Sequence, residues 1–235
     1  MQQNVDSEEL AKFSARAREW WDPEGAFRTL HDINPLRLGY IAERAALHGA
    51  RVLDVGCGGG LLSEAMARQG AQVIGIDMAE ENLAVARAHA AAEQVAIDYR
   101  CIAAEQLAVD RPGSFDVVTC LEMLEHVPEP EKIVAACATA VRPGGALFFS
   151  TINRNAKSFL LAVVGAEYVL GWVPRGTHEY RKLIQPAELA RWCRRTSLTI
   201  HDLRGLHFNP LTQSYYLGGN VDVNYLAHAT KAASA

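Results

Sequence analysis

Two short segments of the chain hold acidic residues and glycines at a spacing that suits a nucleotide-like ligand. Asp54 ends one apolar run and is followed by glycines at alternating positions, Gly56, Gly58 and Gly60. Glycines directly after a buried strand let the backbone turn tightly and approach a ligand, while the next helix points its N-terminal amides at that ligand. Asp77 ends the next apolar run, where a carboxylate accepts hydrogen bonds from ribose hydroxyls. The two segments indicate a nucleotide-type cofactor site.

The glycine spacing does not fit the dinucleotide fingerprint Gly-x-Gly-x-x-Gly. The third glycine of that fingerprint would fall on Leu61 or Ser63, depending on the glycine from which the count starts. An acid two positions before the first of several alternating glycines instead resembles motif I of the class I S-adenosylmethionine-dependent methyltransferases. The expected cofactor is therefore S-adenosyl-L-methionine.

The sequence offers a candidate contact for each part of this cofactor. The three glycines would form a floor against the methionine moiety, and Asp54 would hold the turn or, through water, the ligand's ammonium group. Asp77 would bind the ribose. The structural alternatives are a turn residue for Asp54 and a cap of the helix near Glu80 for Asp77. Arg37 offers a fork for the cofactor carboxylate, with a surface arginine as the alternative.

Adenine recognition is expected to fall to a loop and an apolar residue. The loop over residues 101–107 lacks an acid directly after the third predicted strand, so its backbone groups would have to serve. Leu121 ends the fourth predicted strand, on the side that faces the cofactor. It is expected to make a packing contact.

Glu122, Glu125 and His126 follow the fourth predicted strand and offer chemistry for the reactive end. In a helical turn these positions, i, i+3 and i+4, share one face. They suit Mg²⁺, which would lower the pKa of a substrate hydroxyl. A mechanism without a metal, in which His126 or a glutamate removes the proton as general base, is equally simple. An ordinary scaffold turn is the third interpretation. Three C-terminal histidines are alternative bases: His178, His201 and His207.

A regular alternation of strands and helices must position these residues. Short runs rich in β-branched residues are expected to form strands near residues 51–55, 72–76, 97–102, 115–120, 145–151, 198–204 and 221–229. With helical stretches between them, they predict an α/β fold, and the resemblance of the glycine loop to motif I implies that it is the Rossmann-like class I methyltransferase fold. Its sheet is mainly parallel and seven-stranded, with helices on both faces and ligands at the carboxyl ends of the strands.

Residues 1–48 are expected to form an N-terminal helical cap, with an amphipathic helix over 5–21, for which Asp6 or Ser7 is the candidate N-cap, and a second helix over 35–47. Residues 153–183 interrupt the alternation, and a helix over 186–196 follows. At 235 residues, 49% of them apolar, the chain is predicted to form a single domain, residues 1–235.

The charge and cysteine content limit the partners and the compartment. A net charge of -4 without a run of one sign argues against nucleic acid as a partner. Five cysteines without a Cys-x-x-Cys pair, and an N-terminus without a basic start or an apolar h-region, predict a cytoplasmic protein.

Segments spread along nearly the whole chain carry a more specific pattern than the glycine loop. They are Ala11-Lys12-Phe13, Trp20-Trp21-Asp22, His31-Asp32-Ile33-Asn34-Pro35-Leu36-Arg37, Glu122-Met123-Leu124-Glu125-His126-Val127, Asn153-Arg154-Asn155, Ala162-Val163-Val164-Gly165-Ala166-Glu167-Tyr168, Gly205-Leu206-His207 and Asp222-Val223-Asn224-Tyr225. With them the chain closely resembles the ubiquinone biosynthesis O-methyltransferase family, in its bacterial form without a transit peptide. Members of this family methylate hydroxyls of polyprenylated phenols at two steps of the pathway.

The resemblance implies roles for particular residues. The family's cofactor-binding positions fall on Arg37, Gly56, Asp77 and Leu121. Its proposed Mg²⁺ ligands fall on Glu122, Glu125 and His126. The implied substrate is a polyprenylated phenol or catechol.

The resemblance also implies that residues 156–178 cover the cofactor and contact membrane lipid. A polyprenyl substrate stays in the bilayer, and an apolar segment with Trp172 and flanking basic residues suits the interface. Glycines and Glu167 interrupt this segment too often for a membrane span. Peripheral attachment at the inner face of the cell membrane, and contact with other ubiquinone-biosynthesis proteins, are expected; a buried dimer or lid contact is the alternative.

Three other functions fit parts of the pattern. A carbon methyltransferase of the same pathway would share the cofactor site. A nucleic acid methyltransferase would normally carry an Asn/Asp-Pro-Pro-Tyr-like motif after the fourth strand and a basic face, and the sequence has neither. A noncatalytic scaffold of a quinone-synthesising complex would bind cofactor and lipid without methyl transfer.

Overall fold

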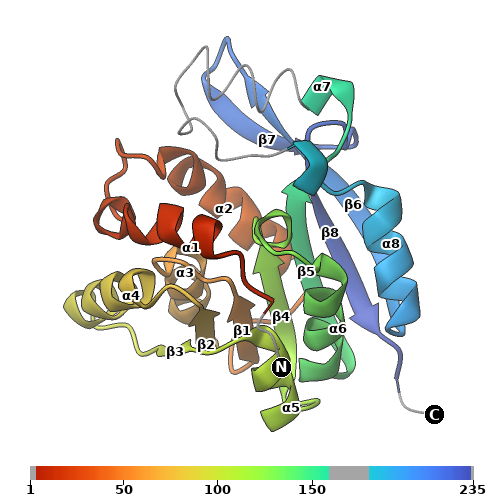
Figure 1. The fold of residues 1–235 in the computed structure, drawn as a ribbon, viewed down its shortest axis with the longest axis horizontal. Helices are drawn as coiled ribbons and strands as arrows, with labels where there is room; N and C mark the ends of the chain where they lie inside the picture. Colours follow the sequence, from red (N-terminus) through yellow and green to blue (C-terminus); the bar gives the residue numbers. More distant parts are fainter. Residues whose placement is uncertain (1–3, 159–179, 234–235) are drawn as a thin grey trace.

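The chain is built around an eight-stranded sheet in a computed structural model, which describes residues 4–158 and 180–233 (Figure 1). The strands lie in the order β3-β2-β1-β4-β5-β8-β6-β7. Their bounds are Arg51–Val55 (β1), Gln72–Asp77 (β2), Asp98–Cys101 (β3), Phe115–Leu121 (β4), Val141–Ile152 (β5), Leu198–Asn209 (β6), Ser214–Gly218 (β7) and Asn224–Lys231 (β8). Strands β1 to β5 pair in parallel, and β8, β6 and β7 add antiparallel pairs. The predicted Rossmann-like α/β fold is confirmed.

The sheet has one strand more than the seven that the sequence predicted. The additional strand is β7, which pairs only with β6, from Gly205 opposite Gly218 to Asn209 opposite Ser214. A five-residue run at the edge of a sheet has too little periodicity of its own to be recognised, because pairing with a neighbour is what makes it a strand.

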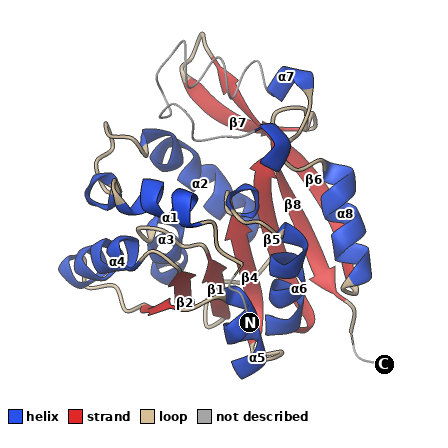
Figure 2. Cartoon of the chain, viewed as in Figure 1, coloured by secondary structure: helices blue, strands red, loops and turns tan. Residues whose placement is uncertain are grey.

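Helices cover both faces of the sheet (Figures 1 and 2). On one face, α2 (Arg28–Ala42) and α3 (Leu61–Arg68) pack on the sheet around Tyr40, Met66 and Phe148. On the other face lie α5 (Ala104–Asp110), α6 (Pro130–Ala140) and α8 (Pro186–Arg195). Helix α4 (Glu80–Ala92) packs beside β3. The apolar residues of the strands are thus buried on both sides, as parallel strands require.

The N-terminal helices differ from their predicted bounds. The helix expected over residues 5–21 is broken into α1 (Ser7–Ser14) and the 3-10 turn η1 (Ala17–Glu19), although Asp6 caps α1 as expected. The helix expected over residues 35–47 is α2, which begins earlier and contains Pro35. Proline is usual in the first turn of a helix, where its missing N–H leaves no hydrogen bond unmade. In α2 the burial of one face, over two turns on each side of Pro35, stabilises the helix by more than the lost backbone hydrogen bond costs.

The segment predicted to cover the cofactor lies mostly outside the described residues. The described parts are α7 (Ala156–Ser158) and the 3-10 turn η4 (Tyr180–Lys182), and the membrane contact assigned to residues 156–178 therefore stays a prediction. Within residues 4–158 and 180–233, no helix has both the length and the apolar character to cross a bilayer.

Gly60 begins α3 in a conformation that other residues adopt with strain. Its φ is +90°, and an added Cβ would lie 2.2 Å from Tyr99 Oη. We expect Gly60→Ala to lower the free energy of unfolding by roughly 2–4 kcal/mol, from the left-handed backbone and the overlap together. Gly49→Ala is the matched control, because its φ is +76° with nothing within 4 Å of the added atom. Urea unfolding of both variants separates the two contributions, and equal losses would contradict the packing argument.

Asp116 ties three strands together through a pH-dependent contact. Its carboxylate accepts from Arg142 Nε (2.7 Å) and from Arg51 N (2.9 Å), which together outweigh burial and hold its pKa at about 2. Because folding lowers the pKa of this carboxyl, its ionised form stabilises the fold at any pH above its pKa in the unfolded chain, near 4. This stabilisation is lost as the pH falls toward 2. Asp116→Asn should cost about 1 kcal/mol at pH 7 and roughly half of that at pH 3. Thermal unfolding at both pH values, beside the exposed control Asp110→Asn, tests this.

Candidate functional site

A cavity of about 960 Å³ opens at the carboxyl ends of β1, β2 and β4. Its walls come from α1, α2, the glycine loop after β1, the turn after β4 and the β6–β7 hairpin. The sequence analysis proposed ten residues as contacts of the cofactor or as the Glu122, Glu125 and His126 group. Nine of these ten line the cavity: Arg37, Asp54, Gly56, Gly58, Asp77, Leu121, Glu122, Glu125 and His126. Gly60 is the exception, because it faces Tyr99 and serves packing rather than the cavity.

The glycine loop is shaped by what packs on it. Gly56 and Gly58 have φ of +71° and +53°, and the amide of Gly56 donates to Ile76 O. A Cβ on Gly56 would lie 2.5 Å from Met123, and one on Gly58 would lie 2.4 Å from Trp20. Both positions therefore need glycine, for the turn and for the close approach of neighbouring side chains.

Asp77 holds the glycine loop to the end of β2. One carboxylate oxygen accepts from Gly58 N at 2.9 Å, and the other accepts from Ala79 N at 2.8 Å. Burial raises the pKa of this carboxyl, while the backbone amides oppose the rise. The bond to Ala79 resembles the capping role suggested from the sequence, but Asp77 also lines the cavity beside the loop. Each oxygen keeps a second lone pair with which to accept a ligand hydroxyl.

Asp54 is buried and bound to two hydroxyl groups. Ser63 Oγ donates to it at 2.6 Å and Thr119 Oγ1 at 2.7 Å, which joins β1 to α3 and β4. Burial raises the pKa of Asp54, and the two hydroxyls work against that rise. This geometry agrees with the structural alternative for Asp54, whose carboxylate holds the turn under the cavity.

Arg37 lies inside the protein, so the alternative of a surface arginine is wrong. Its side chain is 7% exposed and forms an ion pair with Glu122 Oε1 at 3.2 Å. Desolvation lowers the pKa of the guanidinium, and Glu122 opposes this effect. The ion pair uses Nη2, whereas the buried Nε of Arg37 has no hydrogen-bond partner among the described residues. A buried donor without a partner is costly, and a ligand carboxylate would satisfy it.

The apolar contacts expected for adenine lie at the same end of the sheet. Leu121, at the end of β4, lines the cavity and packs in the core beneath α2. The loop after β3 contributes Ile102 and Ala103 to the wall, and the first turn of α5 contributes Glu105. These positions agree with an adenine slot of apolar side chains and backbone groups.

Glu122, Glu125 and His126 do not share a helical face, in contrast to the prediction. Glu122 directly follows β4 and has a φ of +53°, and the 3-10 turn η2 (Leu124–His126) begins only two residues later. The left-handed backbone of Glu122 directs its side chain toward Arg37 and Asn224, while Glu125 accepts from Thr151 Oγ1 at 2.8 Å. Because β4 continues to the cavity wall, the helical turn assumed from the spacing does not form.

As arranged, these three side chains do not make a magnesium site. Glu122 is engaged by a buried guanidinium, and His126 is held by a carboxylate from α1. No group of three His, Cys, Asp or Glu side chains in residues 4–158 and 180–233 is placed to bind a metal ion. We therefore assign no step of the reaction to a cation.

The partner of His126 could not be recognised in the sequence. Glu9, on α1, is 4% exposed, and its Oε2 lies 2.8 Å from His126 Nδ1. Burial lowers the pKa of His126, but the bond to Glu9 and the charges of Glu125 and Glu9 outweigh it and raise this pKa. A glutamate in the first turn of a helix usually serves the helix dipole, and only the folded chain shows that this one is buried.

The other candidate bases are less well placed. His207 lines the cavity and stacks on Tyr216, with ring centroids 5.2 Å apart. His201 is exposed and bonds to Thr230 Oγ1 at 2.7 Å. His178 lies outside the described residues. Among the described histidines singled out as bases, His126 and His207 line the cavity.

Comparison with known proteins decides the family. A family model described as a methyltransferase domain matches residues 53–149. The ubiquinone biosynthesis O-methyltransferase of Hahella chejuensis is 60% identical over 229 residues, which cover 97% of this chain and 96% of the relative. That of Pseudomonas aeruginosa is 58% identical over 230 residues, which cover 98% and 99%. The chain belongs to the ubiquinone biosynthesis O-methyltransferase family. The resemblance seen in the sequence is confirmed.

Solved structures share the fold of this ubiquinone biosynthesis O-methyltransferase family member. Magnesium protoporphyrin IX methyltransferase (ChlM) from Synechocystis PCC 6803, solved with bound SAH, is 19% identical with a TM-score of 0.70, over 94% of this chain and 95% of ChlM. The [4+2]-cyclase SpnF is 20% identical with a TM-score of 0.63, over 86% of this chain and 82% of SpnF. Since one neighbour is a methyltransferase and the other is named as a cyclase, these likenesses establish the fold and leave the reaction to other evidence.

Proposed function

We propose that this chain is an S-adenosylmethionine-dependent O-methyltransferase that methylates phenolic or catechol hydroxyls of polyprenylated ubiquinone precursors, at both O-methylation steps of the pathway. Family membership over nearly the whole chain supports the reaction and the substrate class. The observation that carries the cofactor assignment is Arg37, a buried guanidinium whose Nε has no partner among the described residues, in a cavity that also holds Asp77 and the glycine loop. Such a set suits a ligand with a carboxylate and a ribose.

Each group of the cavity has a role in this reaction. S-adenosylmethionine supplies an electrophilic sulfonium methyl group when bound. Arg37 binds its carboxylate, Asp77 accepts from its ribose hydroxyls, and Leu121 packs against adenine. His126 removes the proton of the substrate hydroxyl as general base, and the oxygen then attacks the methyl carbon in line. Fixing both reactants in one cavity converts a bimolecular step into one within a complex, which supplies much of the rate.

The lining of the cavity suits an amphipathic substrate. It includes apolar side chains from α1 and the β6–β7 hairpin, among them Phe13, Phe208 and Tyr215, as well as the two glutamates and His126. An aromatic head with hydroxyl groups fits the polar side chains, and the start of a prenyl chain fits the apolar ones. Because such a chain partitions into lipid, contact with the membrane surface through residues 156–178 is part of the proposal.

The first experiment follows the label from S-adenosylmethionine to a short-chain prenylated catechol, in parallel with Mg²⁺ and with a chelator. We expect labelled methyl on oxygen, and the two arms measure what a cation adds. Label on a ring carbon would instead support the carbon methyltransferase. Intact cofactor binding without transfer in either arm would support the noncatalytic scaffold, and either of these two results would overturn the proposal.

A further inference from the structure

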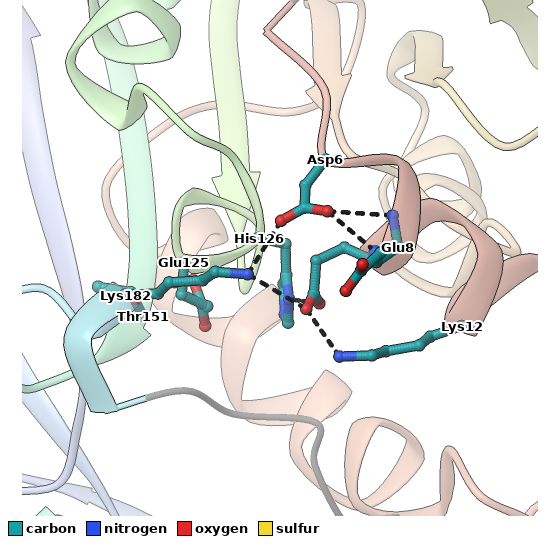
Figure 3. A network of polar contacts seen from close by, with 8 residues as sticks. Asp6, Glu8, Lys12, Glu125, His126, Thr151 and Lys182 are labelled. Atoms are coloured by element: carbon teal, nitrogen blue, oxygen red, sulfur yellow. Dashed lines mark hydrogen bonds and ion pairs between the residues drawn. The ribbon is translucent and has the colours of Figure 1, made fainter.

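The carboxylate of Glu9 is the centre of a network that joins α1 to the reactive end of the cavity. Figure 3 labels its partners His126, Lys12 and Lys182. Its Oε2 contacts His126 Nδ1 at 2.8 Å, and its Oε1 accepts from Lys12 Nζ at 2.9 Å and from Lys182 Nζ at 3.4 Å. Residues 9, 126 and 182 come from α1, η2 and η4, which are far apart in the sequence. The network therefore depends on the folded chain.

Glu9 is an unusual residue for the position it occupies. A glutamate in the first turn of a short N-terminal helix would ordinarily be exposed, as its neighbour Glu8 is, yet Glu9 is buried. A buried carboxylate is expensive unless charged partners and hydrogen bonds compensate it. The partners of Glu9 provide this compensation, so the fold keeps an ionised group against the imidazole of His126.

Helix α1 is fixed in the register that this contact requires. Asp6 caps the helix by accepting from Glu8 N at 3.0 Å, and its other oxygen accepts from Lys182 Nζ at 3.0 Å. On the opposite side, Phe13 meets the ring of His126 edge-on, with centroids 5.0 Å apart. The cap, the lysine and the phenylalanine together restrict both the position of Glu9 and the rotation of the imidazole.

We propose that Glu9 is a positioning residue for methyl transfer: through Nδ1 it fixes the orientation and the tautomer of the His126 ring that receives the substrate proton. A carboxylate that accepts from Nδ1–H leaves the lone pair of the neutral ring on Nε2, and it stabilises the imidazolium that forms. The inference rests on the proposed function, in which His126 is the base. Glu9 itself does not touch the substrate.

The step is balanced without a further reactant. The phenolic O–H bond breaks and an N–H bond forms at His126 Nε2. The oxygen forms a bond to the methyl carbon as the S–CH₃ bond breaks, and the electron pair of that bond stays on sulfur in S-adenosylhomocysteine. Glu9 keeps its charge throughout and faces the positive charge that develops on the ring.

The first test compares Glu9→Gln with its neighbour Glu8→Gln in the full-length protein. Both variants remove one negative charge from the first turn of α1, but only Glu9 contacts His126. We expect Glu9→Gln to lower kcat by roughly 10- to 100-fold with the KM for the catechol and the Kd for S-adenosylmethionine within about twofold, the loss expected when the group that orients a functional histidine is removed. Glu8→Gln should match the unmodified protein. A rise in KM with unchanged kcat would overturn the inference.

A double-mutant cycle separates positioning from a structural role. If Glu9 acts through His126, adding Glu9→Gln to His126→Gln should cause no further loss of kcat, whereas independent effects would multiply. Multiplying losses would overturn the positioning role of Glu9 and leave His126 as the base. Full turnover of His126→Gln alone would instead remove the base itself from the proposed function, and with it the role of Glu9.

A spectroscopic readout needs no turnover. In protein labelled with ¹⁵N-histidine, the Nδ1 proton of His126 should resonate far downfield in the unmodified protein and in Glu8→Gln, because it is shared with a carboxylate. Glu9→Gln should move this signal upfield, which checks the contact even if the variant is less stable. An unchanged signal would contradict the hydrogen bond on which the inference depends.

Discussion

Asp77→Ala will weaken the binding of S-adenosylmethionine and of S-adenosylhomocysteine by the same factor, roughly 10- to 100-fold, because both ligands carry the ribose. The cavity places this carboxylate beside the glycine loop, where its two oxygens already accept from Gly58 N and Ala79 N. A hydrogen bond from a neutral hydroxyl to an ionised acceptor is among the stronger kinds in proteins. Isothermal titration calorimetry of both ligands measures the loss.

The same substitution also frees two loop amides, so a second ligand must isolate the ribose contact. An S-adenosylhomocysteine analogue without ribose hydroxyls should bind weakly to the unmodified protein and equally weakly to Asp77→Ala. The control is Asp98→Ala, on the neighbouring strand β3, whose carboxylate pairs with Arg100 and does not line the cavity. If the analogue loses as much affinity from Asp77→Ala as S-adenosylhomocysteine does, the effect of Asp77 comes from the loop and the ribose assignment is wrong.

The sequence predicted what depends on local periodicity and on backbone chemistry. The alternation from residue 51 onward predicted β1 to β4 and α8 within one residue of their observed bounds, because each lies between clear breaks in the pattern. Strand β5 begins at Val141, four residues before its predicted start, since Arg142-Pro143-Gly144-Gly145 continues the strand instead of preceding it. Asp6 was recognised as a cap because its side chain reaches only the next residues. The glycine loop was found for the same reason, since left-handed turns need glycine wherever they occur.

What the sequence could not predict depends on contacts between distant segments. Strand β7 forms because β6 pairs with it. Helix α2 continues through Pro35 because burial of its apolar side chains against the core stabilises it. The left-handed backbone at Glu122 directs its side chain away from that of Glu125, although the spacing predicted that the two would share one helical face. Glu9 is 117 residues from His126, so no local pattern connects the two. The network is a property of the folded chain.

His126→Gln will lower kcat by roughly 10²- to 10³-fold while the Kd for S-adenosylmethionine stays within about threefold, the size of effect expected for a general base. His126 lies in the cavity wall at the end of η2, while Arg37 and Asp77, the residues proposed to hold the cofactor, come from other elements. His201→Gln, on the exposed side of β6, is the silent control. His207→Gln tests the competing base, because this ring also lines the cavity. A larger loss from His207→Gln than from His126→Gln would reverse the assignment.

The acidity of the substrate decides whether His126 acts on the proton. A nitro-substituted catechol is largely ionised near neutral pH, so it needs no base, whereas an alkyl-substituted catechol keeps its proton until the reaction. His126→Gln should therefore slow transfer to the alkyl catechol far more than transfer to the nitro catechol. In the unmodified protein, the rates for the two catechols should differ much less, because the Glu9-bound ring of His126 removes the proton of the alkyl catechol. Equal losses on both substrates would mean that His126 orients the phenol rather than removing its proton, and the search for the base would then move to the glutamates beside Arg37.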